Sequence, residues 1–125
     1  MKIMLVDDSR TIRNIQKKVL AKLGYEDIVE AADGVEALAA YEKSPPDLLL
    51  VDCSMPNLDG ITLVKTIRRT DKSTPVIMCI DQAEKCRVAE ALEAGVNSYI
   101  VKPFTTETLL ETIDQTLSEL PITVS

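Results

Sequence analysis

Residues 48–60 read LLLVDCSMPNLDG, and the first half of this stretch has the character of a strand buried on both faces of a parallel sheet. The apolar run ends at Asp52, and turn-forming residues follow it. In open α/β sheets, ligands and chemistry collect beyond the carboxyl ends of the strands, so Asp52 is a candidate site residue. The alternative is a structural carboxylate that caps a helix or forms a turn.

Four other segments also predict strands: residues 2–6, 27–31, 74–80 and 98–101. Between and after the strands, apolar residues recur at helical spacing and predict five helices. Ser9 is placed to cap the first helix, and Gly95 to end the fourth. The predicted apolar helix positions are Ile12, Ile15, Val19 and Leu23; Val35, Leu38 and Ala39; Leu63, Val64 and Ile67; Val88, Ala91 and Leu92; and, over residues 106–119, Leu109, Ile113 and Leu117.

This alternation predicts an α/β fold of the doubly wound (βα)5 type. Short links between strands and helices imply right-handed crossovers and a five-stranded parallel sheet covered on both faces. The 125 residues contain no linker, repeat or low-complexity segment. We therefore expect residues 1–125 to form a single domain, without an attached output domain.

Composition and charge exclude several classes of protein. With 46% apolar and 27% charged residues the chain is globular, and no apolar run approaches the ~20 residues of a membrane span. A net charge of -6 with dispersed lysines and arginines argues against direct nucleic-acid binding. The absence of a signal-peptide pattern, together with three cysteines that show no paired spacing, predicts a cytoplasmic protein with free thiols.

The chain contains no histidine, which excludes Ser-His-Asp and Cys-His nucleophile pairs. Carboxylates and a lysine remain, because Asp7, Asp8, Asp52 and Lys102 all end predicted strands and should meet at one sheet edge. Two like charges ~4 Å apart repel by about 4 kcal/mol at an effective dielectric of 20. Three acids beside one lysine leave a charge deficit of two, which one Mg²⁺ ion would balance. A cation and a lysine are also what a transferring phosphoryl group needs.

Three motifs at this edge occur together in one known family. They are VDDS at residues 6–9, VDCSMPNLDG at 51–60 and AGVNSYIVKPF at 94–104. Over essentially its whole length the chain resembles the receiver domain of response regulators, and is similar to the stand-alone chemotaxis regulators of the CheY type. The resemblance implies the flavodoxin-like strand order 2-1-3-4-5.

The resemblance also implies roles for individual residues. Asp52 would be the phosphoacceptor, and Lys102 would contact the phosphoryl oxygens. Asp7, Asp8 and Asp52 would hold Mg²⁺ together with the backbone carbonyl of Ser54. A Lys102-Pro103 bond, which would be cis in such domains, would aim the lysine.

Partners follow from the same resemblance. The phosphodonor would be a histidine kinase, and the domain would be a monomer that signals by changing what it binds, in chemotaxis or motility. It would not be an enzyme, since it would catalyse only its own phosphoryl transfer and dephosphorylation. The target would bind the face of helix 4, strand 5 and helix 5 near Tyr99. From the sequence alone, without the resemblance, it is equally reasonable to interpret Tyr99 as a half-buried aromatic residue of a strand.

The sequence departs from the family pattern at the end of the fourth strand. The family places Ser or Thr there, whereas this chain has Ile80, and no hydroxyl residue occurs between Pro75 and Ser98. A phosphoryl hydrogen bond worth about 1 to 3 kcal/mol is therefore missing. Asp81 adds a carboxylate that we expect to face solvent. Two positions that tune phosphoryl lifetime in the family are occupied by Ser54 and Gln82.

Two other function classes compete with the signalling receiver. Because of Ile80 and Asp81, one alternative is a binding module whose conformation does not respond to phosphorylation. An aspartate-nucleophile phosphatase is disfavoured, since those enzymes carry an acid two residues beyond the nucleophile and this chain has Ser54 there. Nucleotide- and flavin-binding folds are disfavoured because no Gly-rich phosphate loop follows the first strand.

Overall fold

The computed structural model describes residues 1–118, and a five-stranded parallel sheet lies at its centre. The strand order is β2-β1-β3-β4-β5, which confirms the predicted flavodoxin-like α/β fold and the order 2-1-3-4-5. Every neighbouring pair of strands is parallel. The strands are β1 (Lys2–Val6), β2 (Asp27–Ala31), β3 (Leu48–Asp52), β4 (Val76–Asp81) and β5 (Ser98–Lys102).

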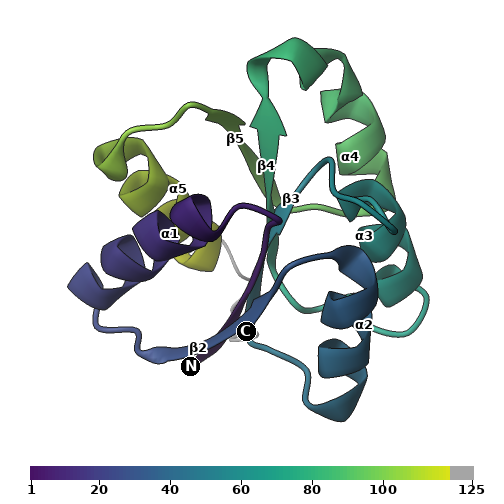
Figure 1. Ribbon diagram of the computed structural model, residues 1–125, viewed down its shortest axis with the longest axis horizontal. Helices are drawn as coiled ribbons and strands as arrows, with labels where there is room; N and C mark the ends of the chain where they lie inside the picture. Colours follow the sequence, from purple (N-terminus) through teal and green to yellow (C-terminus); the bar gives the residue numbers. More distant parts are fainter. Residues whose placement is uncertain (119–125) are drawn as a thin grey trace, which may run out of the picture.

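Helices cover both faces of the sheet: α1 and α5 lie on one side, and α2, α3 and α4 on the other (Figure 1). The predicted last helix is present up to Ser118, the last described residue, and its expected final residue, 119, lies outside the described residues. No described helix is long and apolar enough to cross a membrane. The helices are α1 (Arg10–Lys22), α2 (Gly34–Lys43), α3 (Gly60–Arg68), α4 (Val88–Ala94) and α5 (Thr106–Ser118), and a 3-10 helix, η1 (Gln82–Arg87), precedes α4.

Alternating side chains of the strands build two separate cores. Leu48 and Leu50 of β3 face α1 and α5, whereas Leu49 and Val51 face α2, α3 and α4. All four are completely buried, as expected for a central parallel strand. β3 is therefore held in place by core packing on both of its faces, and Asp52 is its last residue.

Capping residues fix where the helices begin. The Ser9 side chain accepts a hydrogen bond from the Ile12 amide and caps α1, as predicted. Asp33 and Asp59 cap α2 and α3 in the same way. Gly95 ends α4 with φ 110°, a left-handed conformation that glycine adopts without a steric penalty.

The predicted helix faces were wrong at four positions. In α1, the structure buries Gln16 beside Val19 and Leu20, and leaves Ile15 39% exposed. The buried stripe follows i, i+3, i+4 from Gln16, so Ile15 falls outside it. The other three apolar positions that prove to be exposed are Val35, Ala39 and Leu92.

In α2, the buried positions are Gly34, Ala37 and Tyr41. In α4, Ala91 and Ala94 are buried, so Leu92 points outward. Small residues at these helix–sheet contacts set the rotation of each helix, which apolar spacing alone does not determine.

Two further boundaries differ from prediction. The fourth strand begins at Val76 rather than at Thr74, because Thr74 belongs to a turn organised by Asp71. The six residues of η1, which had no predicted structure of their own, lead into α4. The three cysteines are free, as expected. Cys53 and Cys79 are buried, and Cys86 is exposed.

Candidate functional site

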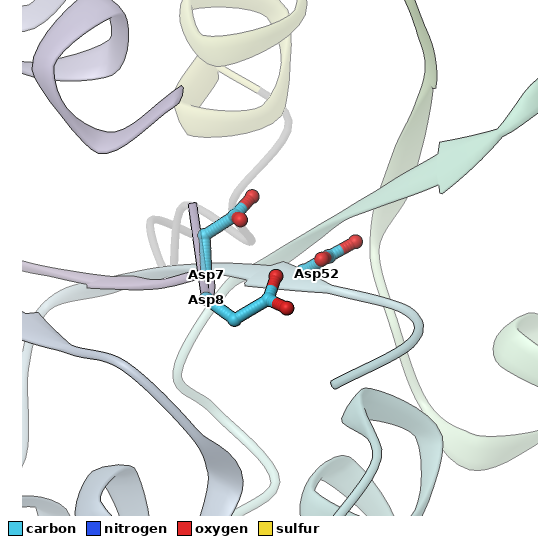
Figure 2. Close-up of side chains that lie close together, drawn as sticks. All are labelled: Asp7, Asp8 and Asp52. Atoms are coloured by element: carbon cyan, nitrogen blue, oxygen red, sulfur yellow. The ribbon is translucent and has the colours of Figure 1, made fainter. Parts of the chain in front are cut away.

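Three carboxylates meet at the carboxyl edge of the sheet. Asp7 and Asp8 follow β1 directly, and Asp52 is the last residue of β3. One oxygen of each can be chosen such that all three lie within 4.8 Å of one another. Figure 2 shows Asp7 and Asp8 extending from adjacent backbone positions toward the side on which Asp52 lies. Asp7 and Asp52 are buried, whereas Asp8 is exposed, so the cluster opens to solvent on the Asp8 side.

Lys102 supplies the positive charge that the sequence predicts for this edge. Its Nζ lies 3.0 Å from Asp7 Oδ2 and 3.1 Å from Asp52 Oδ1, so one ammonium pairs with both the acid that follows β1 and the acid that ends β3. The lysine side chain is itself only 13% exposed. It ends β5, and the Lys102-Pro103 peptide bond that follows is cis.

Burial and neighbouring charges change the acidity of the two central groups. The pKa of Asp52 is raised to about 6, first because the carboxyl is buried and second because Asp7 is close. Burial alone would lower the pKa of Lys102, but the charge of Asp52 and the bonds to Asp7 raise it above its ordinary value. Lys102 therefore remains charged at neutral pH, and Asp52 ionises only near neutrality.

The cluster fits a hard divalent cation. Its donors are carboxylate oxygens, which Mg²⁺ prefers, and one lysine cannot neutralise three acids. The Ser54 side chain is directed to another partner, since its Oγ donates a hydrogen bond to Glu84. A metal role for the Ser54 carbonyl remains a prediction.

The loop after β3 packs closely against the end of that strand. A Cβ on Gly60 would lie 2.1 Å from the carbonyl oxygen of Asp52, so only glycine fits there. The Gly60 amide donates to the Cys53 carbonyl at 2.9 Å. On the other side of the loop, Asn57 adopts φ 71° and its side chain donates to Asp33 at 2.9 Å. These contacts hold the backbone around Asp52 in one position.

The structure places Ile80 and Asp81 at the end of β4, as expected, so no hydroxyl side chain lies there. Ile80 is completely buried and packs in the core under α2, α3 and α4. Asp81 is exposed, as expected, and pairs in register with Lys102 on β5. Tyr99, also on β5, is 43% exposed.

The sequence did not predict one part of the site's surroundings. Glu84 and Arg87, both in η1, contact the loop after β3 through Ser54 and Asp59. Neither residue belongs to a motif or follows a strand directly. No sequence pattern therefore indicated that Glu84 and Arg87 lie beside the loop after β3.

The chain is similar in sequence to proteins of one known family. The sequence model of the response regulator receiver domain matches residues 3–114. The chain is 38% identical to the chemotaxis protein CheY of Bacillus subtilis, covering 94% of this chain and 98% of that protein. It is 44% identical to CheY1 of Helicobacter pylori strain J99, covering 94% of this chain and 97% of that protein.

Solved structures are similar as well. Vibrio cholerae CheY4 superposes with a TM-score of 0.83 at 37% identity, covering 92% of this chain and 97% of that one. The receiver domain of NtrX from Brucella abortus superposes with a TM-score of 0.87 at 28% identity, covering 94% of this chain and 99% of that one.

Proposed function

Because this chain belongs to the response regulator receiver domain family, whose members are non-enzymatic proteins of two-component signalling, we propose that it accepts a phosphoryl group from a histidine kinase on Asp52. The observation that carries the proposal is the ammonium of Lys102 held between Asp7 and Asp52 at the sheet edge. The phosphorylated domain would then signal through a change in partner binding.

The proposed transfer uses one oxygen of Asp52 as the nucleophile. This oxygen attacks the phosphorus of the phosphohistidine, an O–P bond forms, and the P–N bond breaks with its electron pair going to the imidazole. Only the ionised carboxylate is nucleophilic, and with a pKa of about 6 it is mostly ionised at neutral pH. A Mg²⁺ ion held by Asp7, Asp8, Asp52 and the Ser54 carbonyl would supply charge stabilisation for the phosphoryl oxygens.

Lys102 has a definite task in this proposal. Its Nζ already donates to Asp52, so it lies within reach of a group attached to that carboxylate. As the phosphoryl group arrives, the ammonium can exchange its hydrogen bonds with the acids for hydrogen bonds to the phosphoryl oxygens.

The cellular process that we propose for this chain is based on its relatives. Two of them are named as chemotaxis proteins and match over nearly their full length. We propose that this chain is likewise a cytoplasmic, monomeric regulator of chemotaxis or motility. Its target would bind the α4–β5–α5 face, where a hollow of about 290 Å³ is lined by Leu92, Tyr99 and Thr112.

Labelling with a small phosphodonor tests the proposal. Wild type incubated with acetyl phosphate and Mg²⁺ should gain the mass of one phosphoryl group, and Asp52→Asn should gain none. Asp81→Asn is the matched control, because it removes an exposed acid from the end of the neighbouring strand and should leave labelling unchanged. Labelling of Asp52→Asn at the wild-type level would contradict the assignment.

Ile80 favours a second candidate, a binding module whose partner affinity does not depend on phosphorylation. A buried isoleucine cannot donate a hydrogen bond to a phosphoryl oxygen. Equal partner affinity of the labelled and unlabelled protein, at a verified labelled fraction, would support this second candidate.

A further inference from the structure

A group of side chains joins the loop after β3 to the segment that leads into α4. Ser54 Oγ donates a hydrogen bond to Glu84 Oε2. Arg87 extends the connection, since its Nη2 lies 3.4 Å from Asp59 Oδ2 and its Nη1 lies 3.9 Å from Glu84 Oε2. We call Ser54, Asp59, Glu84 and Arg87 the rim bridge.

One end of the rim bridge lies beside the proposed acceptor. Ser54 is two residues beyond Asp52, and Asp59 caps α3 by accepting the Thr62 amide at 2.8 Å. Gly60 directly follows Asp59 in the chain and lies against the Asp52 carbonyl, so the loop is also held close to Asp52 at its far end. A change at Asp52 that moves this loop therefore also moves the partners of Glu84 and Arg87.

The other end of the rim bridge reaches α4. Arg87 is the residue immediately before this helix, and its Nε lies 3.1 Å from Glu90 Oε1 in the first turn. α4 has only seven residues, and no side chain caps its start. Its orientation at this end therefore depends in part on what Arg87 contacts.

Phosphorylation of Asp52 would act directly on the charges of the rim bridge. A phosphoryl group carries nearly two negative charges and three strong acceptor oxygens. It would compete for the Ser54 hydroxyl, repel the Glu84 carboxylate and attract the Arg87 guanidinium. The bond between Ser54 and Glu84 is thus more favourable in the unphosphorylated state, and this difference between the states is what a switch requires.

We propose that the rim bridge carries the state of Asp52 to α4, with Glu84 as the positioning residue that releases Ser54 when a phosphoryl group is present. This inference rests on the proposed function, and it assigns to Glu84 and Arg87 the coupling that the buried Ile80 cannot provide through a hydroxyl.

The test compares the α4 response of wild type, Glu84→Ala, Glu84→Gln and Glu93→Ala. Amide chemical shifts of α4 are recorded before and after addition of acetyl phosphate and Mg²⁺, and the phosphorylated fraction of each sample is measured by intact mass. Glu93→Ala is the matched control, because it removes an exposed acid of α4 that lies outside the rim bridge and is not the Arg87 partner Glu90. A thermal melt of each variant verifies that it is folded.

At equal phosphorylated fraction, the α4 shift change of Glu84→Ala should fall to less than about half of the wild-type value. Unphosphorylated Glu84→Ala should already have its α4 amide shifts displaced toward those of phosphorylated wild type, since the bond between Ser54 and Glu84 is absent in both. Glu84→Gln retains an acceptor for Ser54 and should recover part of the response, and Glu93→Ala should respond fully.

Two results would overturn the inference alone: a full α4 response in Glu84→Ala, or a labelled wild type whose α4 amides do not shift. If the mass shows that wild type is not phosphorylated at all, the proposed function fails and the inference fails with it. The mass measurement therefore separates the two kinds of failure.

Discussion

The Nζ atom of Lys102 lies 3.1 Å from Oδ1 of Asp52, so the acid that ends β3 and the base that ends β5 form an ion pair across the end of β4. Both side chains are largely buried. A buried acid is expensive without a counter-charge, and here the counter-charge comes from a residue far along the chain. Several measurable properties depend on this pair.

Replacement of Lys102 by alanine should slow phosphorylation of Asp52 by about 10- to 100-fold. The variant loses a charge-assisted hydrogen bond worth about 1.5–3 kcal/mol, and each 1.4 kcal/mol corresponds to a factor of ten. The rate is measured with acetyl phosphate at saturating Mg²⁺. Lys72→Ala, at an exposed position before β4, is the control and should react at the wild-type rate. A Lys102→Ala rate within twofold of wild type would exclude a role for the ammonium in the transfer.

Asp52→Asn should stabilise the metal-free protein at pH 7. The folded pKa of about 6 lies above the unfolded value of 3.8, so the folded state binds the proton more tightly. Wild-type stability should therefore fall as pH rises from about 4 to about 6, and Asn removes this penalty. We expect a gain on the order of 1 kcal/mol, because water screens part of the charge. Urea denaturation at pH 4 and pH 7 measures the stability difference between Asp52→Asn and wild type. A difference that is larger at pH 4 than at pH 7 would contradict the raised pKa of Asp52.

Asp71→Asn should destabilise the fold by about 1–3 kcal/mol at pH 7. Asp71 accepts hydrogen bonds from Tyr41, Thr74 and the Ser73 amide, and asparagine removes the negative charge that strengthens these bonds. Burial would raise the pKa of Asp71, but the bonds from Thr74 and Tyr41 lower it below its ordinary value of 3.8.

The sign of the pH dependence follows from this lowered pKa. The stabilisation from Asp71 is fully present above about pH 4 and is lost as pH falls through the folded pKa. Urea midpoints of wild type and Asp71→Asn should therefore converge in acid. Asp114→Asn, at an exposed position of α5, is the control and should match wild type throughout. A constant difference between wild type and Asp71→Asn down to the most acidic pH would argue against the lowered pKa.

Gln16→Met should stabilise the protein. Gln16 is 2% exposed, and within the described residues its Oε1 has no hydrogen-bond partner, while its Nε2 contacts the Cys79 sulfur at 3.6 Å. An unsatisfied buried polar atom costs about 1–3 kcal/mol, and methionine has a similar shape without that atom. Chemical denaturation should show a higher midpoint at unchanged slope. A lower midpoint would mean that the Gln16 oxygen has a partner, such as an internal water.

The fold and the acidic cluster could be predicted from sequence because both depend on local pattern. Buried apolar runs that end at Asp7 and Asp52 define strands, and parallel topology then brings the acids together. The burial of Gln16 in place of Ile15 could not be predicted, because isoleucine is more hydrophobic than glutamine and would be expected to be the buried residue of the two. The contact of Ser54 with Glu84 joins segments 30 residues apart through η1, whose path no periodic pattern indicates.

Chemical mapping of the phosphorylated residue tests the central claim most directly. After incubation with acetyl phosphate and Mg²⁺, borohydride reduces an aspartyl phosphate to homoserine, and peptide mass spectrometry locates the product. The account predicts homoserine at position 52 alone, and none when EDTA removes the metal. Homoserine at Asp7 or Asp8, or at position 52 to the same extent with EDTA, would contradict it.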